Sequence, residues 1–159
     1  MNRIVSFSVD HLNLPCGVYI SRQDGDIVTY DIRTRSPNRE PVMDTGAVHT
    51  VEHLFATYIR NAPRFAGHII YFGPMGCRTG FYLITRALPH ADALVLIRDT
   101  FAFIAGFAGD IPGAAAAECG NYQDHNLPGA RAEADKMRLI VDGTTESALK
   151  YPAKQAKNA

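Results

Sequence analysis

The sequence has no excess of charge of either sign and no long apolar run, and each absence narrows its function. The 16 basic and 16 acidic residues cancel and do not gather in long runs, so nothing points to a nucleic-acid or anionic membrane partner. No apolar stretch reaches the roughly 18 residues that a membrane span needs, and residues 1–14 contain no apolar signal-peptide region. We therefore expect a cytoplasmic protein that acts on a small polar molecule.

Cysteine is also scarce, and its number and spacing exclude a disulfide framework. The chain has only Cys16, Cys77 and Cys119, an odd number at unrelated spacings. This usage is typical of a reducing compartment, where thiols are free to bind metal or to take part in catalysis. The 159 residues, 47% of them hydrophobic, are enough to form a core without disulfides. We expect one domain over residues 1–159.

Hydrophobic periodicity predicts an α+β fold in which a mainly antiparallel sheet packs against helices. Alternating or β-rich segments predict strands, and a turn is expected over 22–25. Three longer segments have helical periodicity, the last of them ending near Gly143. The polar tail 151–159 is expected to be frayed. The predicted strands are 4–9, 17–20, 26–32, 68–72 and 81–85, and the predicted helices are 44–61, 91–107 and 129–141.

Two histidines, His49 and His53, stand four residues apart in the predicted helix 44–61. Side chains at this spacing project from one face about one turn apart, so two imidazoles can hold one metal ion. The apolar residues fall on the opposite arc, and the histidines' own neighbours are mostly small, which leaves room for something to approach. Asp44 or Thr45 can cap the helix. The small neighbours are Gly46, Thr50, Ala56 and Thr57.

Glu52 lies between these histidines in the order H-x-x-E-H. From this position it can reach the rim of the same site as a proton carrier rather than a ligand. The alternative is an amphipathic helix with two polar histidines and no ligand. A metal site therefore requires a third donor from elsewhere in the chain.

The candidates for that third donor lie between the last two predicted helices. Cys119, in a segment that need not be regular, would complete a His/His/Cys set with a fourth position open for water or substrate. Glu118 and His125 are rival donors nearby. The residue pattern leaves these alternatives open.

Cys77 stands in a loop with glycine at positions 73, 76 and 80. Glycine permits backbone turns that other residues resist, so the loop can present this thiol sharply. Arg78 beside it would favour the thiolate, which is the reactive form. Cys77 is accordingly a candidate reactive group, and the alternative is a small buried residue in a turn.

Three separated motifs in order resemble the LuxS family of S-ribosylhomocysteine lyases. They are HTVEHLFATYIRN (49–61), GPMGCRTGFYL (73–83) and ECGNYQDHNLPGA (118–130), supported by SFSVDH (6–11), YDIR (30–33) and PNRE (37–40). The resemblance spans roughly residues 3 to 135 and implies a two-layer α/β sandwich like that of LuxS and related metallopeptidases.

The resemblance implies a role for each matching residue. His49, His53 and Cys119 would hold a divalent metal, ferrous iron natively with zinc or cobalt able to replace it. Glu52 and Cys77 would be the acid/base pair.

The resemblance further implies a homodimer with active sites at the interface, where Ser6, His11 and Arg33 contact substrate. The implied reaction converts S-ribosylhomocysteine to homocysteine and 4,5-dihydroxy-2,3-pentanedione, the precursor of the quorum-sensing signal autoinducer-2. The carbonyl migrates along the ribose through enediolates before β-elimination.

One segment departs from the family pattern, since Tyr71-Phe72-Gly73 stands where many members carry an acidic residue followed by Ile-Ser. Two other functions remain open. A small inverzincin-type metallopeptidase would use His49, His53 and Glu52 as the base, with Glu118 as third ligand. A non-catalytic metal-binding interaction protein would need neither Glu52 nor Cys77.

Overall fold

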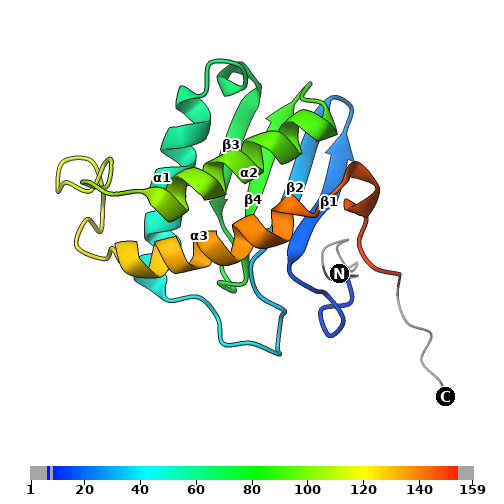
Figure 1. Cartoon of the computed structure of the whole chain (residues 1–159), viewed down its shortest axis with the longest axis horizontal. Helices are drawn as coiled ribbons and strands as arrows, with labels where there is room; N and C mark the ends of the chain where they lie inside the picture. The colour runs from blue at the N-terminus through cyan, green and yellow to red at the C-terminus, as the bar shows by residue number, and fades with distance from the viewer. Residues whose placement is uncertain (1–6, 8, 154–159) are drawn as a thin grey trace, which may run out of the picture.

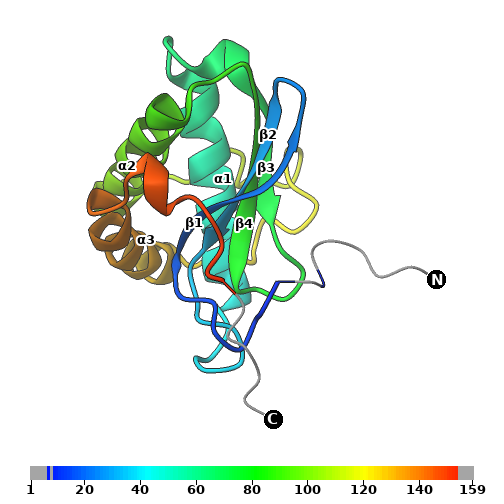
Figure 2. The same cartoon turned by 90° about the vertical axis from the view of Figure 1, so that its right-hand side faces the viewer.

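Three long helices pack against one face of a four-stranded sheet, as Figures 1 and 2 show. The computed structural model describes residues 7 and 9–153. All neighbouring strands are antiparallel, which confirms the α+β prediction. In sheet order the strands are β1 (Gly17–Asp24), β2 (Ile27–Arg33), β4 (Gly80–Arg86) and β3 (Ile69–Pro74).

Side-chain alternation in β2 gives the sheet two different faces. Val28, Tyr30 and Ile32 belong to the hydrophobic core beneath the helices. Because successive side chains of a strand point to opposite faces, Asp31 and Arg33 lie on the face away from that core. Both are nonetheless buried, so other parts of the chain must cover them.

Helix α1 (Thr45–Asn61) begins where the sequence predicts, because the Asp44 carboxylate caps it by accepting the backbone N–H of Ala47 at 3.0 Å. Its core side packs on the sheet, with the Phe55 ring stacked on Phe72 of β3 at 3.9 Å between centroids. Helices α2 (His90–Gly106) and α3 (Leu127–Asp142) complete the layer, and Gly143 follows α3 as predicted. Two single-turn helices, η2 (Ala66–His68) and η3 (Glu146–Ala148), were not predicted.

The first hairpin is tighter than predicted. Strand β1 continues to Asp24, so the expected turn over 22–25 is wrong; the chain reverses at Gly25, whose φ of +60° suits glycine. Continued pairing with β2 favours the longer strand, because each added pair satisfies backbone groups.

The two ends of the chain are described only in part. The predicted strand 4–9, including Ser6, lies largely outside the described residues, and Phe7 and Val9 are not in strand conformation. Residues 154–159 of the expected frayed tail also lie outside them. Tyr151 is ordered, however, since its ring stacks on Tyr19 at 5.0 Å. Among the described helices, none has both the length and the apolar character that crossing a bilayer requires.

Candidate active site

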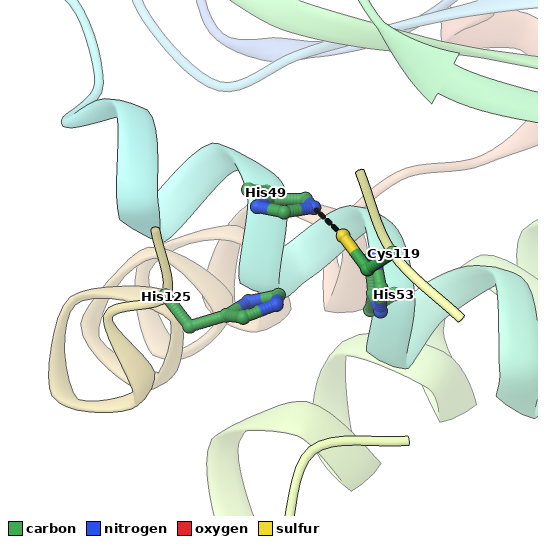
Figure 3. Close-up of side chains that lie close together, drawn as sticks. All are labelled: His49, His53, Cys119 and His125. Carbon is green, nitrogen blue, oxygen red and sulfur yellow. Dashed lines mark hydrogen bonds between the residues drawn. The ribbon is translucent and has the colours of Figure 1, made fainter. Parts of the chain in front are cut away.

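Four potential metal-binding side chains converge where α1 meets the loop between α2 and α3. His49 and His53 project from α1, while Cys119 and His125 come from the loop, as Figure 3 shows. One donor atom from each lies within 4.8 Å of the others. The rings of His49 and His53 are 85° apart with centroids separated by 4.6 Å, so both can direct a lone pair toward a common point.

The backbone of the loop fixes the tautomers of both α1 histidines. Nδ1 of His49 donates to the carbonyl of Asp124, and Nδ1 of His53 donates to the carbonyl of Pro112, each at 2.8 Å. Because a carbonyl only accepts, each Nδ1 carries the proton and each Nε2 keeps a lone pair. Metal-binding histidines are generally oriented in this way, so these two residues fit a divalent ion.

Cys119 reaches the same point from residues 107–126, a loop without helix or strand. Its Sγ lies 3.3 Å from Nε2 of His49, and the backbone N–H of Asn121 points at the sulfur from 3.4 Å. That N–H donates a hydrogen bond to the sulfur, and a thiolate sulfur is the form that binds metal. Glu118 is not part of the described group of converging donors, so the ligand set of the metallopeptidase alternative is not assembled.

His125 is close enough to be a fourth donor but is differently oriented. Its ring stacks on that of His49, 19° from parallel with centroids 4.1 Å apart. Two nearly parallel rings cannot both direct in-plane lone pairs at one ion, so His125 fits a supporting position rather than the ligand set. Burial, and then proximity to His49 and His53, lowers its pKa. The ring is therefore neutral at neutral pH.

Thr50, which follows His49 in α1, ties His125 and the end of the loop to the helix. Its hydroxyl donates to the carbonyl of Gly46 at 2.7 Å and accepts the backbone N–H of Asn126 at 2.9 Å. Nδ1 of His125, 3.1 Å from that hydroxyl, must then be the donor. Its Nε2 is buried and has no hydrogen-bond partner among the described residues. The room expected beside the histidines is thus filled by the chain's own loop.

Asp44 makes a second connection to the loop. Its carboxylate accepts the side-chain amide of Asn126 at 3.0 Å, and this bond, followed by the Ala47 N–H, lowers the pKa of Asp44. Asp44 therefore both caps α1 and holds the segment that carries His125.

Cys77 is exposed in the turn between β3 and β4. The expected role of glycine is wrong in detail, because the left-handed residue of this turn is Arg78 at φ +57°. Gly80 instead permits close packing, since a Cβ there would lie 2.5 Å from the carbonyl oxygen of Ile32. The turn presents Cys77 to a cavity of about 600 Å³ that His11 and Arg33 also line.

The wall of that cavity includes a buried ion pair on the face of the sheet that points away from the helices, called the open face below. Nη2 of Arg33 donates to Oδ2 of Asp31 at 2.5 Å, and the hydroxyl of Tyr151 donates to the same oxygen at 2.8 Å. Burial is the largest single influence and would lower the pKa of Arg33, but the charge and hydrogen bond of Asp31, together with the nearby Cys77 and Tyr151, raise this pKa overall. Asp31 and Tyr151 were not predicted as site residues, although alternation in YDIR puts Asp31 and Arg33 on one face.

Glu52 faces a different cavity. With His49 it lines a space of about 300 Å³, and its carboxylate lies 3.8 Å from Nε2 of His53. Pro74, Met75 and Gly76 line both this cavity and the one that Cys77 faces. Within one chain, the two predicted proton carriers therefore lie on opposite sides of this short segment. Ser6 lies outside the described residues.

In the segment Tyr71-Phe72-Gly73, which departs from the family pattern, the middle residue packs in the core. Phe72 is buried and stacks between Phe55 and Phe81, at 3.9 Å and 5.2 Å. Tyr71 is exposed, and its ring lies over Gly73. Position 71 thus carries a neutral aromatic side chain close to Gly73.

Comparison with known proteins agrees with this geometry over nearly the whole chain. The sequence model of the family described as S-ribosylhomocysteinase (LuxS) matches residues 4–147. An S-ribosylhomocysteine lyase of Clostridium acetobutylicum is 52% identical over 157 residues, which are 96% of this chain and 99% of the relative. That of Clostridium beijerinckii is 50% identical, with 96% and 99% covered. That of Phocaeicola vulgatus is 47% identical, with 98% and 100% covered. The chain therefore belongs to the LuxS family.

Proposed function

We propose that this chain is a carbon–sulfur lyase that cleaves S-ribosyl-L-homocysteine to L-homocysteine and 4,5-dihydroxy-2,3-pentanedione. The observation that carries the proposal is the full-length match to relatives named S-ribosylhomocysteine lyase, combined with the converging donors of His49, His53 and Cys119. We further propose that residues 1–159 act as one cytoplasmic domain.

The proposed metal ligands are Nε2 of His49, Nε2 of His53 and the thiolate of Cys119. Imidazole suits iron, zinc and cobalt alike, and the soft thiolate is compatible with each. Ferrous iron is the proposed native ion, with zinc or cobalt able to replace it. Such an ion would act as a Lewis acid that stabilises negative charge developing on the sugar oxygens. The near-parallel stacking of His125 on His49 supports a three-residue set that leaves one position open.

Cys77 and Glu52 are the proposed proton carriers. A carbonyl moves along the ribose when a proton leaves the neighbouring carbon and another is delivered to the former carbonyl carbon, with matching transfers between oxygens. Once the carbonyl lies β to the sulfur, loss of a proton from the intervening carbon breaks the carbon–sulfur bond. The departing sulfur takes a proton and leaves as homocysteine. Exposure of Cys77 and the open position of Glu52 support these roles.

The proposed active form is a homodimer whose sites combine residues of two chains. Within one chain Cys77, His11 and Arg33 line one cavity, while His49 and Glu52 line another. A symmetric dimer would supply the opposite cavity from a second copy. Ser6, His11 and Arg33 would then contact substrate beside Cys77.

Product analysis tests the reaction. Protein loaded with ferrous iron or cobalt should release free thiol from S-ribosylhomocysteine, together with a dicarbonyl product. Cys77→Ala and Glu52→Gln should keep the metal and fold but lower the rate by about 10²–10⁴-fold, the usual contribution of a proton carrier. Fully metallated wild-type protein that released no thiol would refute the proposal. Normal turnover by both variants would instead refute Cys77 and Glu52 as the proton carriers.

Subunit mixing tests the shared site. If the metal of one chain serves Cys77 of the other, a His49→Ala/Cys77→Ala heterodimer keeps one complete site. Random exchange of equal amounts should then restore about a quarter of the wild-type rate, because half of the dimers carry one of two sites. A mixture of His49→Ala and Glu52→Gln is the control and should stay inactive, since both residues belong to α1. No recovery in the first mixture after verified exchange would exclude the shared arrangement.

A further inference from the structure

Thr79 links the buried charge pair of the open sheet face to Cys77. It immediately precedes β4 and is buried, with 6% of its surface exposed. Its Oγ lies 2.7 Å from Nη1 of Arg33 and 3.0 Å from Sγ of Cys77. The Thr79 hydroxyl is therefore the direct neighbour of both groups.

The chemistry of the two neighbours decides where the hydroxyl hydrogen lies. A guanidinium only donates, so the oxygen of Thr79 accepts from Arg33. Its single hydrogen remains free to donate to the sulfur, and when Cys77 is a thiolate the sulfur can only accept, so the hydroxyl must be the donor. Arg33 is itself held by the 2.5 Å bond to Asp31. The directions from Arg33 to Asp31 and from Arg33 to Thr79 are thus fixed, and ionisation of Cys77 fixes the direction from Thr79 to the sulfur.

The backbone keeps Thr79 in this position. Its carbonyl accepts the N–H groups of Thr34 and Arg35 at 3.0 Å and 3.1 Å. The following glycine leaves no space for movement toward β2, because a Cβ on Gly80 would lie 2.5 Å from the carbonyl of Ile32. The hydroxyl is consequently preorganised rather than recruited when the sulfur ionises.

We propose that Thr79 is a positioning residue that donates a hydrogen bond to Cys77 and stabilises its thiolate form. Hydrogen bonding to the charged form of a group favours that form. A thiolate held in this way is poised to accept a proton. The consequence for turnover rests on the proposed lyase function, whereas the ionisation of Cys77 can be measured without substrate.

Several other groups also influence the charge of Cys77. Arg78 is its neighbour in sequence, and the titratable groups facing the same cavity come from the N-terminal segment, the loop before α1, two strands and the C-terminal segment. They are His11, Asp31, Arg33, Glu40, Tyr82 and Tyr151. All of them remain when only the hydroxyl of Thr79 is removed, so a difference between variants reports that hydroxyl.

The test is the pH dependence of Cys77 alkylation in the metal-loaded protein. Iodoacetamide reacts with the thiolate, and mass spectrometry of the peptide containing Cys77 separates it from Cys16 and Cys119. Thr79→Val should shift the midpoint upward by about one pH unit, the equivalent of one hydrogen bond to a charged group. Thr79→Ser, which keeps the hydroxyl, should restore the wild-type midpoint.

Thr85→Val is the matched control, because Thr85 is a buried threonine like Thr79, lies within β4, and has a hydroxyl with no partner among the described residues. Its midpoint should equal that of wild type. If Thr79→Val folds poorly by circular dichroism, Thr79→Ala is measured instead. A wild-type midpoint in the hydroxyl-free variant, or an equal shift in Thr85→Val, would overturn the inference.

Parallel thiol-release assays separate the two proposals. A shifted midpoint in a protein that never releases thiol would leave the role of Thr79 intact and refute the lyase function. An unshifted midpoint in Thr79→Val, in a protein that does release thiol, would refute the role of Thr79 and leave the lyase function intact.

Discussion

The cluster of potential metal ligands (His49, His53 and Cys119) and the Cys77 cavity are built in different ways. The cluster belongs to the helix layer: His49 and His53 are presented by α1, and backbone carbonyls of an irregular loop orient both rings. The cavity lies on the open face of the sheet, where side chains of Arg33, Asp31 and Thr79 hold one another. Metal binding should therefore depend on the loop, and the ionisation of Cys77 should depend on the buried pair of Arg33 and Asp31.

The largest effect should come from removing a ligand from the helix layer. His49→Ala or Cys119→Ala should lose nearly all bound metal and all thiol release, because a site with three protein ligands would keep only two. His125→Ala should retain near-stoichiometric metal, since its ring stacks on His49 rather than converging with it. Metal analysis by mass spectrometry of the purified proteins checks both. Equal metal loss in His125→Ala would show that His125 is itself a ligand and not a supporting residue.

The next effect should be specific to the open face of the sheet. Asp31→Ala leaves Arg33 buried without its partner, which typically costs about 3–5 kcal/mol of unfolding free energy. Urea unfolding measures this loss, and metal stoichiometry of the folded protein should remain unchanged. Asp24→Ala is the control, because its bond to Arg22 is exposed and its removal should barely move the urea midpoint. Loss of metal in Asp31→Ala would show that the two regions are coupled.

A smaller effect should follow from loosening the loop. Thr50→Val removes the hydroxyl that holds Asn126 and His125. Substitutions in groups that support metal ligands usually weaken metal binding by about 10–100-fold, and competition with a chelator measures this change. Thr57→Val, two turns further along α1 and away from the loop, should bind metal like wild type. Equal weakening in both would indicate a general effect on α1.

The smallest effect concerns the backbone next to His53. Gly113 adopts φ +73°, and a Cβ there would lie 3.2 Å from Nδ1 of His53. Gly113→Ala should therefore cost about 1–2 kcal/mol of unfolding free energy, the strain of a left-handed alanine. Gly120→Ala is the matched control in the same loop, because its added Cβ would meet nothing within 4 Å. Urea unfolding of the two variants distinguishes local strain from a general intolerance of the loop.

Much of the helix layer could be predicted because its signals are local. The four-residue spacing put His49 and His53 on one face of a helix, and Asp44 and Gly143 marked where helices begin and end. The hairpin of β1 and β2 was less predictable. Its turn position depends on how many cross-strand pairs form, which the polar residues 22–24 do not reveal.

The sequence by itself determined the residue types of the site and, through alternation in β2, that Asp31 and Arg33 share one face. It did not determine which of Glu118, Cys119 and His125 would meet the histidines. The path of residues 107–126 has no periodicity, and it is set by bonds from Asn126 to Asp44 and Thr50, about 80 residues earlier in the chain.

Tertiary structure likewise decided that Tyr151 reaches Asp31, 120 residues away in sequence, and that Thr79 stands between Arg33 and Cys77. Local patterns encode periodicity along one element. The partners of a buried polar group are chosen by whichever distant segments can satisfy its hydrogen bonds once the core has formed.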